Sequence, residues 1–185
     1  MKTIFLDRDG VINEDTGYPC SWKNFKIIDG VVEALELLIR NDYNLIIVTN
    51  QSGIARNLFT EADYHNLMKQ FIKYFSEKKI IFKDILYCPH HPNGIIKKYA
   101  KQCNCRKPSS GLIDLAKKRY NIDVNNSYMI GDKISDVQAG LEANIKNNFL
   151  IQPKRYEKPH NFKVFKNLLK CAEYIVFRDT KENIL

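Results

Sequence analysis

The segment "TIFLDRDG", residues 3–10, joins a short apolar run to two aspartates that are separated by a single residue. A continuous apolar run of this length is typical of a strand that is buried on both faces of a parallel sheet. Five further runs predict strands of the same kind: "LIIVTN" (45–50), "DILYC" (84–88), "SYMIGD" (127–132), "NFLI" (148–151) and "YIVF" (174–177).

Helical patterns fill the intervals between these runs. Apolar residues recur at helical spacing after Asp29 and again after Thr60, which we expect to be the N-caps of two helices. Strands that alternate with helices predict an α/β fold with a doubly wound, mostly parallel sheet. From Pro153 to about Asn167 the chain is charged and holds two prolines, so we expect irregular structure there before a last helix and strand.

The composition is that of an ordinary globular protein, with 185 residues and 44% hydrophobic content. We expect a single domain over residues 1–185, with a divergent C-terminal segment at 153–185. No run approaches the roughly 18 apolar residues of a membrane helix, and the first residues hold no long apolar stretch, so a cytoplasmic protein without membrane contact is expected. The formal charge of +8 is spread over the chain, which favours a lysine-rich surface over a nucleic-acid site.

Polar residues follow the expected strands at their carboxyl ends, where ligands bind in doubly wound sheets. Asp7, Asp9 and Asp132 would converge there, and clustered carboxylates favour a hard divalent cation such as Mg2+. Thr49, the N–H groups after it and Lys107 would surround a phosphoryl group. An isolated D-x-D is more often a turn. Here four polar elements, "DRDG", "TNQSG", "CRKP" and "GDKISD", stand at strand and helix boundaries. Their combination instead indicates phosphoryl transfer through an aspartyl-phosphate.

Residues 87–108, "YCPHHPNGIIKKYAKQCNCRKP", contain three of the five cysteines and two of the four histidines. A C-x-H pair, a gap of twelve residues and a C-x-C pair supply three thiolates and one imidazole, which suit a closed tetrahedral Zn2+ site. Unligated thiols and a strained Cys103–Cys105 disulfide are the alternatives, and His91 competes with His90. The four candidate zinc ligands are Cys88, His90, Cys103 and Cys105.

Four motifs resemble those of the haloacid dehalogenase (HAD) superfamily: "FLDRDGVIN" (5–13), "VTNQSGIAR" (48–56), "CRKPSSG" (105–111) and "MIGDKISD" (129–136). Within that superfamily, residues 3–152 look like the histidinol-phosphatase and D-glycero-D-manno-heptose 1,7-bisphosphate phosphatase family. The resemblance implies a HAD-like Rossmannoid fold and a zinc loop at 88–105, and it selects His90 over His91. Too little chain separates Asp9 from Thr49, or Asn50 from Lys107, for a cap domain of about 50 residues, so a capless enzyme is expected.

The resemblance also implies a role for each motif residue. Asp7 would be the nucleophile and Asp9 the general acid and base. Mg2+ would be held by Asp7, Asp132 and the backbone carbonyl of Asp9, with Asp136 supporting the cluster. Strand alternation predicts that Arg8 points away from both aspartates, without a catalytic role. The expected substrate-binding residues are Asp15, Thr16, Gly17, Tyr18, Thr49, Asn50, Gln51, Ser52, Arg106, Lys107 and Lys133.

The expected activity is removal of the 7-phosphate of a phosphorylated sugar, D-glycero-D-manno-heptose 1,7-bisphosphate, in heptose biosynthesis for bacterial surface polysaccharide. The expected enzyme is a monomer. Histidinol-phosphate phosphatase is the alternative, since the same motifs serve both, and the short chain favours the sugar. A polynucleotide 3'-phosphatase or a zinc-bearing nucleic-acid module would need a basic stripe with stacking aromatics, which the sequence does not clearly show.

Overall fold

A six-stranded sheet forms the centre of the computed structural model, which describes residues 1–152 and 162–182. All strand pairs are parallel, in the order β3-β2-β1-β4-β5-β6. The strands are β1 (Thr3–Leu6), β2 (Asn44–Asn50), β3 (Asp84–Cys88), β4 (Tyr128–Gly131), β5 (Asn147–Ile151) and β6 (Lys163–Phe165). The first five coincide with five of the predicted apolar runs to within one residue at each end.

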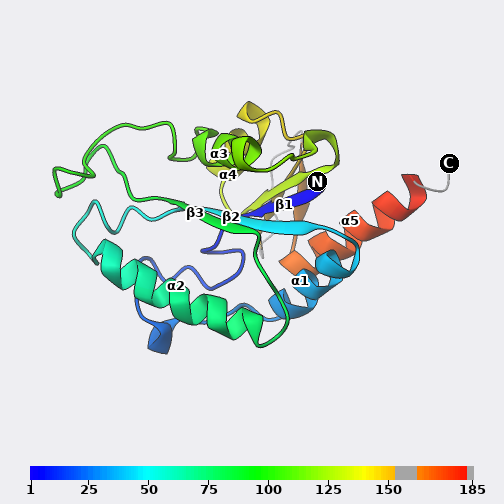
Figure 1. The fold of residues 1–185 in the computed structure, drawn as a ribbon, viewed down its shortest axis with the longest axis horizontal. Helices are drawn as coiled ribbons and strands as arrows, with labels where there is room; N and C mark the ends of the chain where they lie inside the picture. Colours follow the sequence, from blue (N-terminus) through cyan, green and yellow to red (C-terminus); the bar gives the residue numbers. More distant parts are fainter. Residues whose placement is uncertain (153–161, 183–185) are drawn as a thin grey trace.

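Helices cover both faces of the sheet (Figure 1). On one face lie α1 (Val31–Arg40), α2 (Glu61–Ser76) and α5 (Leu168–Glu182), and on the other lie α3 (Gly111–Arg119) and α4 (Ile134–Glu142). Each face has its own apolar core, because strand side chains alternate between the two: Ile4 and Leu6 pack into one core and Phe5 into the other. The predicted α/β class and doubly wound sheet are confirmed.

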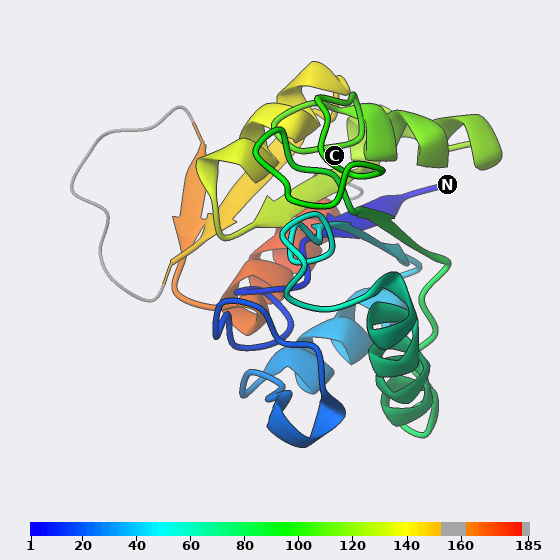
Figure 2. The ribbon, with the colours of Figure 1, turned by 90° about the vertical axis from the view of Figure 1, so that its left-hand side faces the viewer.

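The chain reverses its direction across the sheet beside β1. It proceeds from β1 through β2 to the edge strand β3, and then returns to β4 on the other side of β1. The N–H of Asp7 donates to the carbonyl of Ile130 at 2.9 Å, so the first residue after β1 is held against β4. A reversal of this kind leaves a crevice at the carboxyl ends of the strands. The loops at that end lie on the left of Figure 1 and face the viewer in Figure 2.

One of the two predicted helix N-caps is confirmed and the other is wrong. Thr60 caps α2 as predicted: its side chain accepts from the N–H of Asp63, and the Asp63 side chain accepts from the N–H of Thr60. Asp29 is not the cap of α1. Gly30 holds that position with φ 81°, a conformation that glycine adopts without steric cost.

The C-terminal part differs from the prediction. Residues 174–177, predicted to be a strand, belong to α5, whose buried residues Leu168, Cys171, Ala172 and Ile175 recur at helical spacing. A four-residue apolar run does not distinguish a strand from a buried turn of helix. Within the stretch predicted to be irregular, β6 adds a short parallel strand beside β5, while residues 153–161 lie outside the described part of the chain.

Two long loops approach the carboxyl end of the sheet without forming a separate cap. Between β1 and α1, the only helical turn is a 3-10 turn (Trp22–Asn24), and the described residues 89–110 between β3 and α3 contain no helix or strand. The expectation of a capless architecture is therefore confirmed for these described loops. In residues 1–152 and 162–182 no helix combines the length and the apolar character needed to cross a membrane.

Candidate active site and metal-binding cluster

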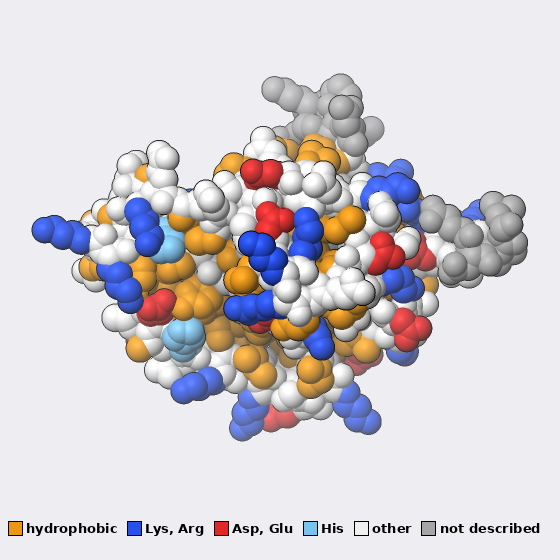
Figure 3. All heavy atoms as spheres, turned by 45° about the horizontal axis from the view of Figure 1, so that its top comes forward, with side chains coloured by type: hydrophobic (Ala, Val, Ile, Leu, Met, Phe, Trp, Pro, Cys, Tyr) orange, Lys and Arg blue, Asp and Glu red, His pale blue; other side chains and the backbone are white. Residues whose placement is uncertain are grey.

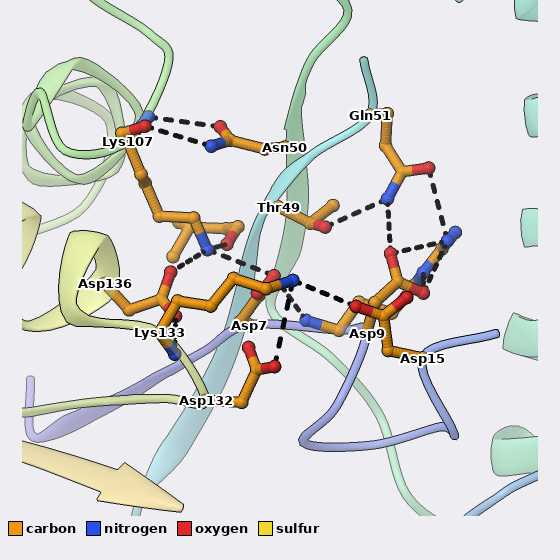
Figure 4. A network of polar contacts seen from close by, with 12 residues as sticks. Asp7, Asp9, Asp15, Thr49, Asn50, Gln51, Lys107, Asp132, Lys133 and Asp136 are labelled. Atoms are coloured by element: carbon orange, nitrogen blue, oxygen red, sulfur yellow. Dashed lines mark hydrogen bonds and ion pairs between the residues drawn. The ribbon is translucent and has the colours of Figure 1, made fainter. Parts of the chain in front are cut away.

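A cleft of about 530 Å³ opens at the carboxyl ends of the strands. Figure 4 shows how side chains from several loops converge there. The expected site residues Thr16, Thr49 and Asp132 are not part of its lining, and Thr16 is exposed. The lining residues are Asp7, Asp9, Asp15, Gly17, Tyr18, Pro19, Asn50, Gln51, Ser52, Arg106, Lys107, Pro108, Lys133, Ser135 and Asp136.

Lys107 is a buried cation between two buried carboxylates. Its Nζ lies 3.0 Å from Asp7 Oδ1 and 2.6 Å from Asp136 Oδ1, and it donates to the carbonyl of Val48 at 2.8 Å. Burial lowers the pKa of Lys107, but the two carboxylates together raise it by more than burial lowers it, so the ammonium stays charged. A fixed positive charge is therefore held beside Asp7.

Asn50 ties the end of β2 to the loop that carries Lys107. Its side-chain Nδ2 donates to the carbonyl of Lys107, and its Oδ1 accepts from the N–H of Lys107, both at 3.1 Å. The following Lys107–Pro108 peptide is cis. This reciprocal pair explains how two residues 57 positions apart are placed at one cleft.

The carboxylates of Asp7, Asp132 and Asp136 form a compact acidic cluster, with one oxygen from each lying within 4.8 Å of the others. Burial raises the pKa of Asp132 to about 7, and the Asp7 charge adds to the rise. Asp132 Oδ1 is buried without a hydrogen-bond partner. Gly10, at φ +84°, permits this close approach, because a Cβ there would lie 2.3 Å from Asp132 Oδ2. Buried, mutually repelling oxygens of this kind fit a hard divalent cation.

Lys133 bridges two loops across the cleft (Figure 4). Its Nζ donates to Asp15 Oδ2 at 3.0 Å and lies 3.7 Å from Asp132 Oδ2. Burial lowers the pKa of Lys133, but the two carboxylates outweigh it and raise the pKa overall. The backbone N–H of Lys133 donates to Asp136 Oδ2 at 2.9 Å, which fixes the start of α4. A cation is thus held at the cleft between Asp15 and Asp132.

Arg8 contradicts the prediction that its side chain points away from the aspartates. Its guanidinium donates to Asp9, with Nη2 2.9 Å from Oδ1 and 3.0 Å from Oδ2. Strand alternation does not extend to these positions, because β1 ends at Leu6 and the chain then turns, with the N–H groups of Ile12 and Asn13 donating to the carbonyl of Arg8.

A polar network continues from Asp9 to the end of β2. Gln51 Nε2 donates to Asp9 Oδ2 at 2.9 Å and to Thr49 Oγ1 at 3.0 Å, and Asn13 Nδ2 donates to Asp9 Oδ1 at 2.9 Å. Thr49 therefore lies beneath the cleft as a buried partner of Gln51. The sequence interpretation did not single out Asn13 or Ser135, although both stand inside the motifs that it quoted.

The four candidate zinc ligands meet at one point of the loop after β3. The Cys88, Cys103 and Cys105 sulfurs lie 3.1 to 3.5 Å apart, and His90 Nδ1 lies 3.3 Å from the Cys105 sulfur. All three cysteines are free thiols, so the Cys103–Cys105 disulfide is not formed. Hydrogen bonding with Cys88 lowers the pKa of Cys105 to about 5, as suits a thiolate ligand. The donor set, three thiols and an imidazole, fits a tetrahedral Zn2+.

His91, the competing ligand, lies outside this cluster. Its Nε2 contacts Arg56 Nη2 at 3.0 Å, and its Nδ1 accepts from the N–H of Asn93 at 3.1 Å. The carbonyl of Ala55 accepts from two N–H groups of the same loop, those of Ile95 and Ile96. The loop after β3 is therefore docked on the loop after β2.

Comparison with known proteins agrees with this geometry. A family profile described as HAD-hydrolase-like matches residues 104–150. The D-glycero-beta-D-manno-heptose-1,7-bisphosphate 7-phosphatase of Escherichia coli (strain K12) is 43% identical over 152 residues, which cover 82% of this chain and 80% of that protein. The enzyme of the same name from Haemophilus influenzae is 45% identical over 151 residues, 82% of each chain.

A solved structure of a heptose bisphosphate phosphatase has the same fold as this chain. The D,D-heptose 1,7-bisphosphate phosphatase from B. bronchiseptica, complexed with magnesium and phosphate, superimposes with a TM-score of 0.83 at 28% identity. The alignment covers 96% of this chain and 99% of that one. The chain therefore belongs to the heptose bisphosphate phosphatase family of the HAD superfamily and is a phosphoric monoester hydrolase.

Proposed function

We propose that this protein hydrolyses the 7-phosphate of D-glycero-D-manno-heptose 1,7-bisphosphate, in heptose biosynthesis for bacterial surface polysaccharide. One observation carries the chemistry: the Asp7 carboxylate faces the cleft while the buried Lys107 ammonium lies 3.0 Å away. The substrate class comes from relatives of that name at 43% and 45% identity over four fifths of the chain.

In the first step, an Asp7 oxygen attacks the phosphorus, and the bond from phosphorus to the C7 oxygen breaks. Lys107 offsets negative charge on the nucleophile and on the transferred group. Asp9 gives a proton to the departing C7 oxygen, which leaves as the sugar hydroxyl. Asp7 then carries the phosphoryl group as an acyl phosphate.

In the second step, water attacks that phosphorus and Asp9 takes a proton from the water. The bond from phosphorus to the Asp7 oxygen breaks, which releases inorganic phosphate and restores the Asp7 carboxylate. Asp9 lines the cleft, which supports this assignment.

Mg2+ fits the acidic cluster, with Asp7, Asp132 and the backbone carbonyl of Asp9 as the proposed ligands. The unpartnered Asp132 Oδ1 and the close carboxylates support this assignment. When bound, the cation would neutralise phosphoryl charge and lower the barrier to attack. Asp136 Oδ1 lies 2.6 Å from Lys107 Nζ and its Oδ2 accepts from the N–H of Lys133, so both oxygens of Asp136 are engaged, whereas Asp132 Oδ1 is not.

Zn2+ is the proposed occupant of the cysteine–histidine cluster, in a structural role. Arg106 and Lys107 directly follow Cys105, so a fixed loop would hold both cations at the cleft. Arg106 Nη1 also donates to the carbonyl of His90, at 3.3 Å. Three thiolates and an imidazole leave no open position for catalysis.

Arg106 and Lys133 are proposed to bind the distal C1 phosphate. Both line the cleft, and neither forms an ion pair with Asp7. An extended C7 phosphate reaches a buried nucleophile more easily than a phosphate on the crowded ring carbon. The C1 phosphate would then lie outward, where charge-assisted hydrogen bonds can hold it.

One phosphate-release assay tests the assignment. Both anomers of heptose 1,7-bisphosphate, histidinol phosphate and a 3'-phosphorylated oligonucleotide would be compared by kcat/KM. We expect the heptose bisphosphate to be preferred by at least about tenfold, since charge-assisted contacts to the second phosphate stabilise binding by about 1.5–3 kcal/mol. Faster turnover of histidinol phosphate would overturn the proposal. The face drawn in Figure 3 does not favour the oligonucleotide, because acidic side chains lie among its Lys and Arg side chains.

A further inference from the structure

Arg8 stands between the two catalytic aspartates in sequence, and its side chain is completely buried. The guanidinium holds Asp9 through three contacts: Nε to Oδ1 at 3.1 Å, Nη2 to Oδ1 at 2.9 Å and Nη2 to Oδ2 at 3.0 Å. Both carboxylate oxygens are therefore engaged by one rigid, planar group.

The remaining surroundings of this guanidinium are mostly apolar. It lies 5.5 Å from the ring centroid of Phe25 and 5.8 Å from that of Tyr64, and Nη1 lies 3.5 Å from the sulfur of Met68. Within residues 1–152 and 162–182, Asp9 is the one carboxylate at ion-pair distance from Arg8. A buried charge is costly unless it is paired, so these apolar surroundings favour the ion pair between the Arg8 guanidinium and the Asp9 carboxylate.

Two further donors complete the cradle around Asp9. Asn13 Nδ2 donates to Oδ1 and Gln51 Nε2 donates to Oδ2, each at 2.9 Å. Arg8 Nη2 also donates to Gln51 Oε1 at 3.2 Å, so two of the residues that donate to Asp9 are hydrogen-bonded to each other. Rotation of the Asp9 carboxylate would break several of these contacts at once.

We propose that Arg8 is a positioning residue that fixes the direction of the Asp9 carboxylate toward the leaving and attacking oxygens. The inference rests on the proposed role of Asp9 as general acid and base. It gives a reason for an arginine inside the core, where an apolar side chain would pack at lower cost. Arg8 itself does not line the cleft.

The first test is Arg8→Lys, which keeps the charge but removes the planar fork. The measured quantity is kcat/KM, which reports transfer to Asp7 and excludes the later hydrolysis. For heptose bisphosphate we expect a loss of about 10²-fold, the usual cost of misplacing a catalytic group by about 1 Å. For p-nitrophenyl phosphate the loss should be below about tenfold, because its phenolate leaves without a proton from Asp9.

The second test places Arg8→Lys in an Asp9→Asn background. If Arg8 acts through Asp9, the second substitution should lower kcat/KM for heptose bisphosphate by less than about threefold, since the effects of coupled residues do not add. Independent losses that multiply would overturn the inference and indicate a general packing role for Arg8. Equal losses on both substrates in Arg8→Lys alone would overturn it as well.

Asp9→Asn alone separates this inference from the mechanism beneath it. If that variant spares p-nitrophenyl phosphate while Arg8→Lys harms both substrates equally, only the role of Arg8 is wrong. If Asp9→Asn harms both substrates equally, the assignment of Asp9 is wrong and the inference fails with it. Should Arg8→Lys not fold by circular dichroism, Arg8→Gln is the second variant. Loss of folding in both would also overturn the inference, because the fold itself would then require the arginine.

Discussion

At the scale of single residues, the site depends on a carboxylate that is both buried and paired. Burial raises the pKa of Asp7 and the Asp136 carboxylate adds to the rise, whereas the Lys107 ammonium opposes it. In this setting the proposed nucleophile is almost fully buried yet remains in contact with a cation. Small changes of chemical group at position 7 should therefore affect reaction far more than folding.

Asp7→Asn should lower kcat by at least about 10⁴-fold, since removal of a nucleophile in a hydrolase costs up to about 10⁶-fold. The amide keeps the shape of the side chain, so substrate binding should be retained, as equilibrium dialysis can measure. Asp114→Asn on α3, outside the cleft, is the matched control and should leave turnover unchanged. Turnover of a few per cent in Asp7→Asn would contradict a covalent mechanism.

Asp132 predicts a pH dependence of stability in the magnesium-free enzyme. Its pKa is raised from 3.8 to about 7, so between these values the folded state keeps a proton that the unfolded chain has lost. The contribution of Asp132 to the free energy of unfolding should therefore fall as pH rises through that window. Mg2+ binds the ionised form, so its stabilising effect should grow across the same range. Thermal unfolding without and with added Mg2+, in the absence of a chelator, measures both trends.

Asp132→Asn is the control for this pH dependence. The amide does not titrate, so the decline between pH 4 and 7 should become shallower in the magnesium-free protein. An unchanged slope would show that other groups cause the dependence.

At the scale of elements, the proposed zinc site would connect the two ends of the loop after β3. Cys88 ends a buried strand, whereas Cys103 and Cys105 come from the far end of the loop, next to α3. The two segments pack against the same core cluster, and their thiol groups meet there. The loop should therefore loosen when one sulfur is removed.

Cys103→Ala should reduce the zinc content from about one ion per chain to well below it, because tetrahedral structural sites need all four ligands. A loss of about 2 kcal/mol would lower the melting temperature by about 4–8 °C for a chain of this length. Elemental analysis and calorimetry measure the two effects. Cys20→Ala, at an exposed free cysteine, is the control and should change neither. Full zinc content in Cys103→Ala would argue against the assigned ligand set.

The helices and strands also show how much of the fold the sequence predicts. Buried parallel strands are continuous apolar runs, so β1 to β5 were predictable, as was the capping box at Thr60. The helix at 174–177 was mistaken for a strand because a short apolar run fits both, and only packing against α1 and the sheet decides. The contact between Arg8 and Asp9 depends on where β1 ends, which a periodic pattern cannot fix to one residue.

At the scale of the whole molecule, four loops that are distant in sequence surround one cleft. The loop after β1 supplies Asp15, the loop after β2 supplies Gln51, the loop after β3 supplies Arg106 and the loop after β4 supplies Lys133. The topology determines this convergence, because β1 lies between β2 and β4 with all carboxyl ends at one edge. Selectivity for a substrate with two phosphates is therefore expected to be a property of the assembled cleft.

Arg106→Ala should narrow the preference for heptose 1,7-bisphosphate over heptose 7-phosphate by about 10- to 100-fold in kcat/KM, the worth of a charge-assisted hydrogen bond. Hydrolysis of the monophosphate should change much less, since it lacks the distal group. Arg119→Ala is the control, because Arg119 lies on α3 and pairs with Asp84 of β3. A uniform loss on both substrates would place Arg106 at the reacting phosphate instead.

Phosphorus NMR of the product of heptose 1,7-bisphosphate identifies the phosphate that leaves. We expect inorganic phosphate to appear while the anomeric C1 phosphate signal survives and the C7 phosphate signal disappears. The extended primary phosphate should reach Asp7, with the C1 phosphate held outward by Arg106 and Lys133. A product that keeps its C7 phosphate and loses its C1 phosphate would contradict the proposed orientation and the activity assigned here.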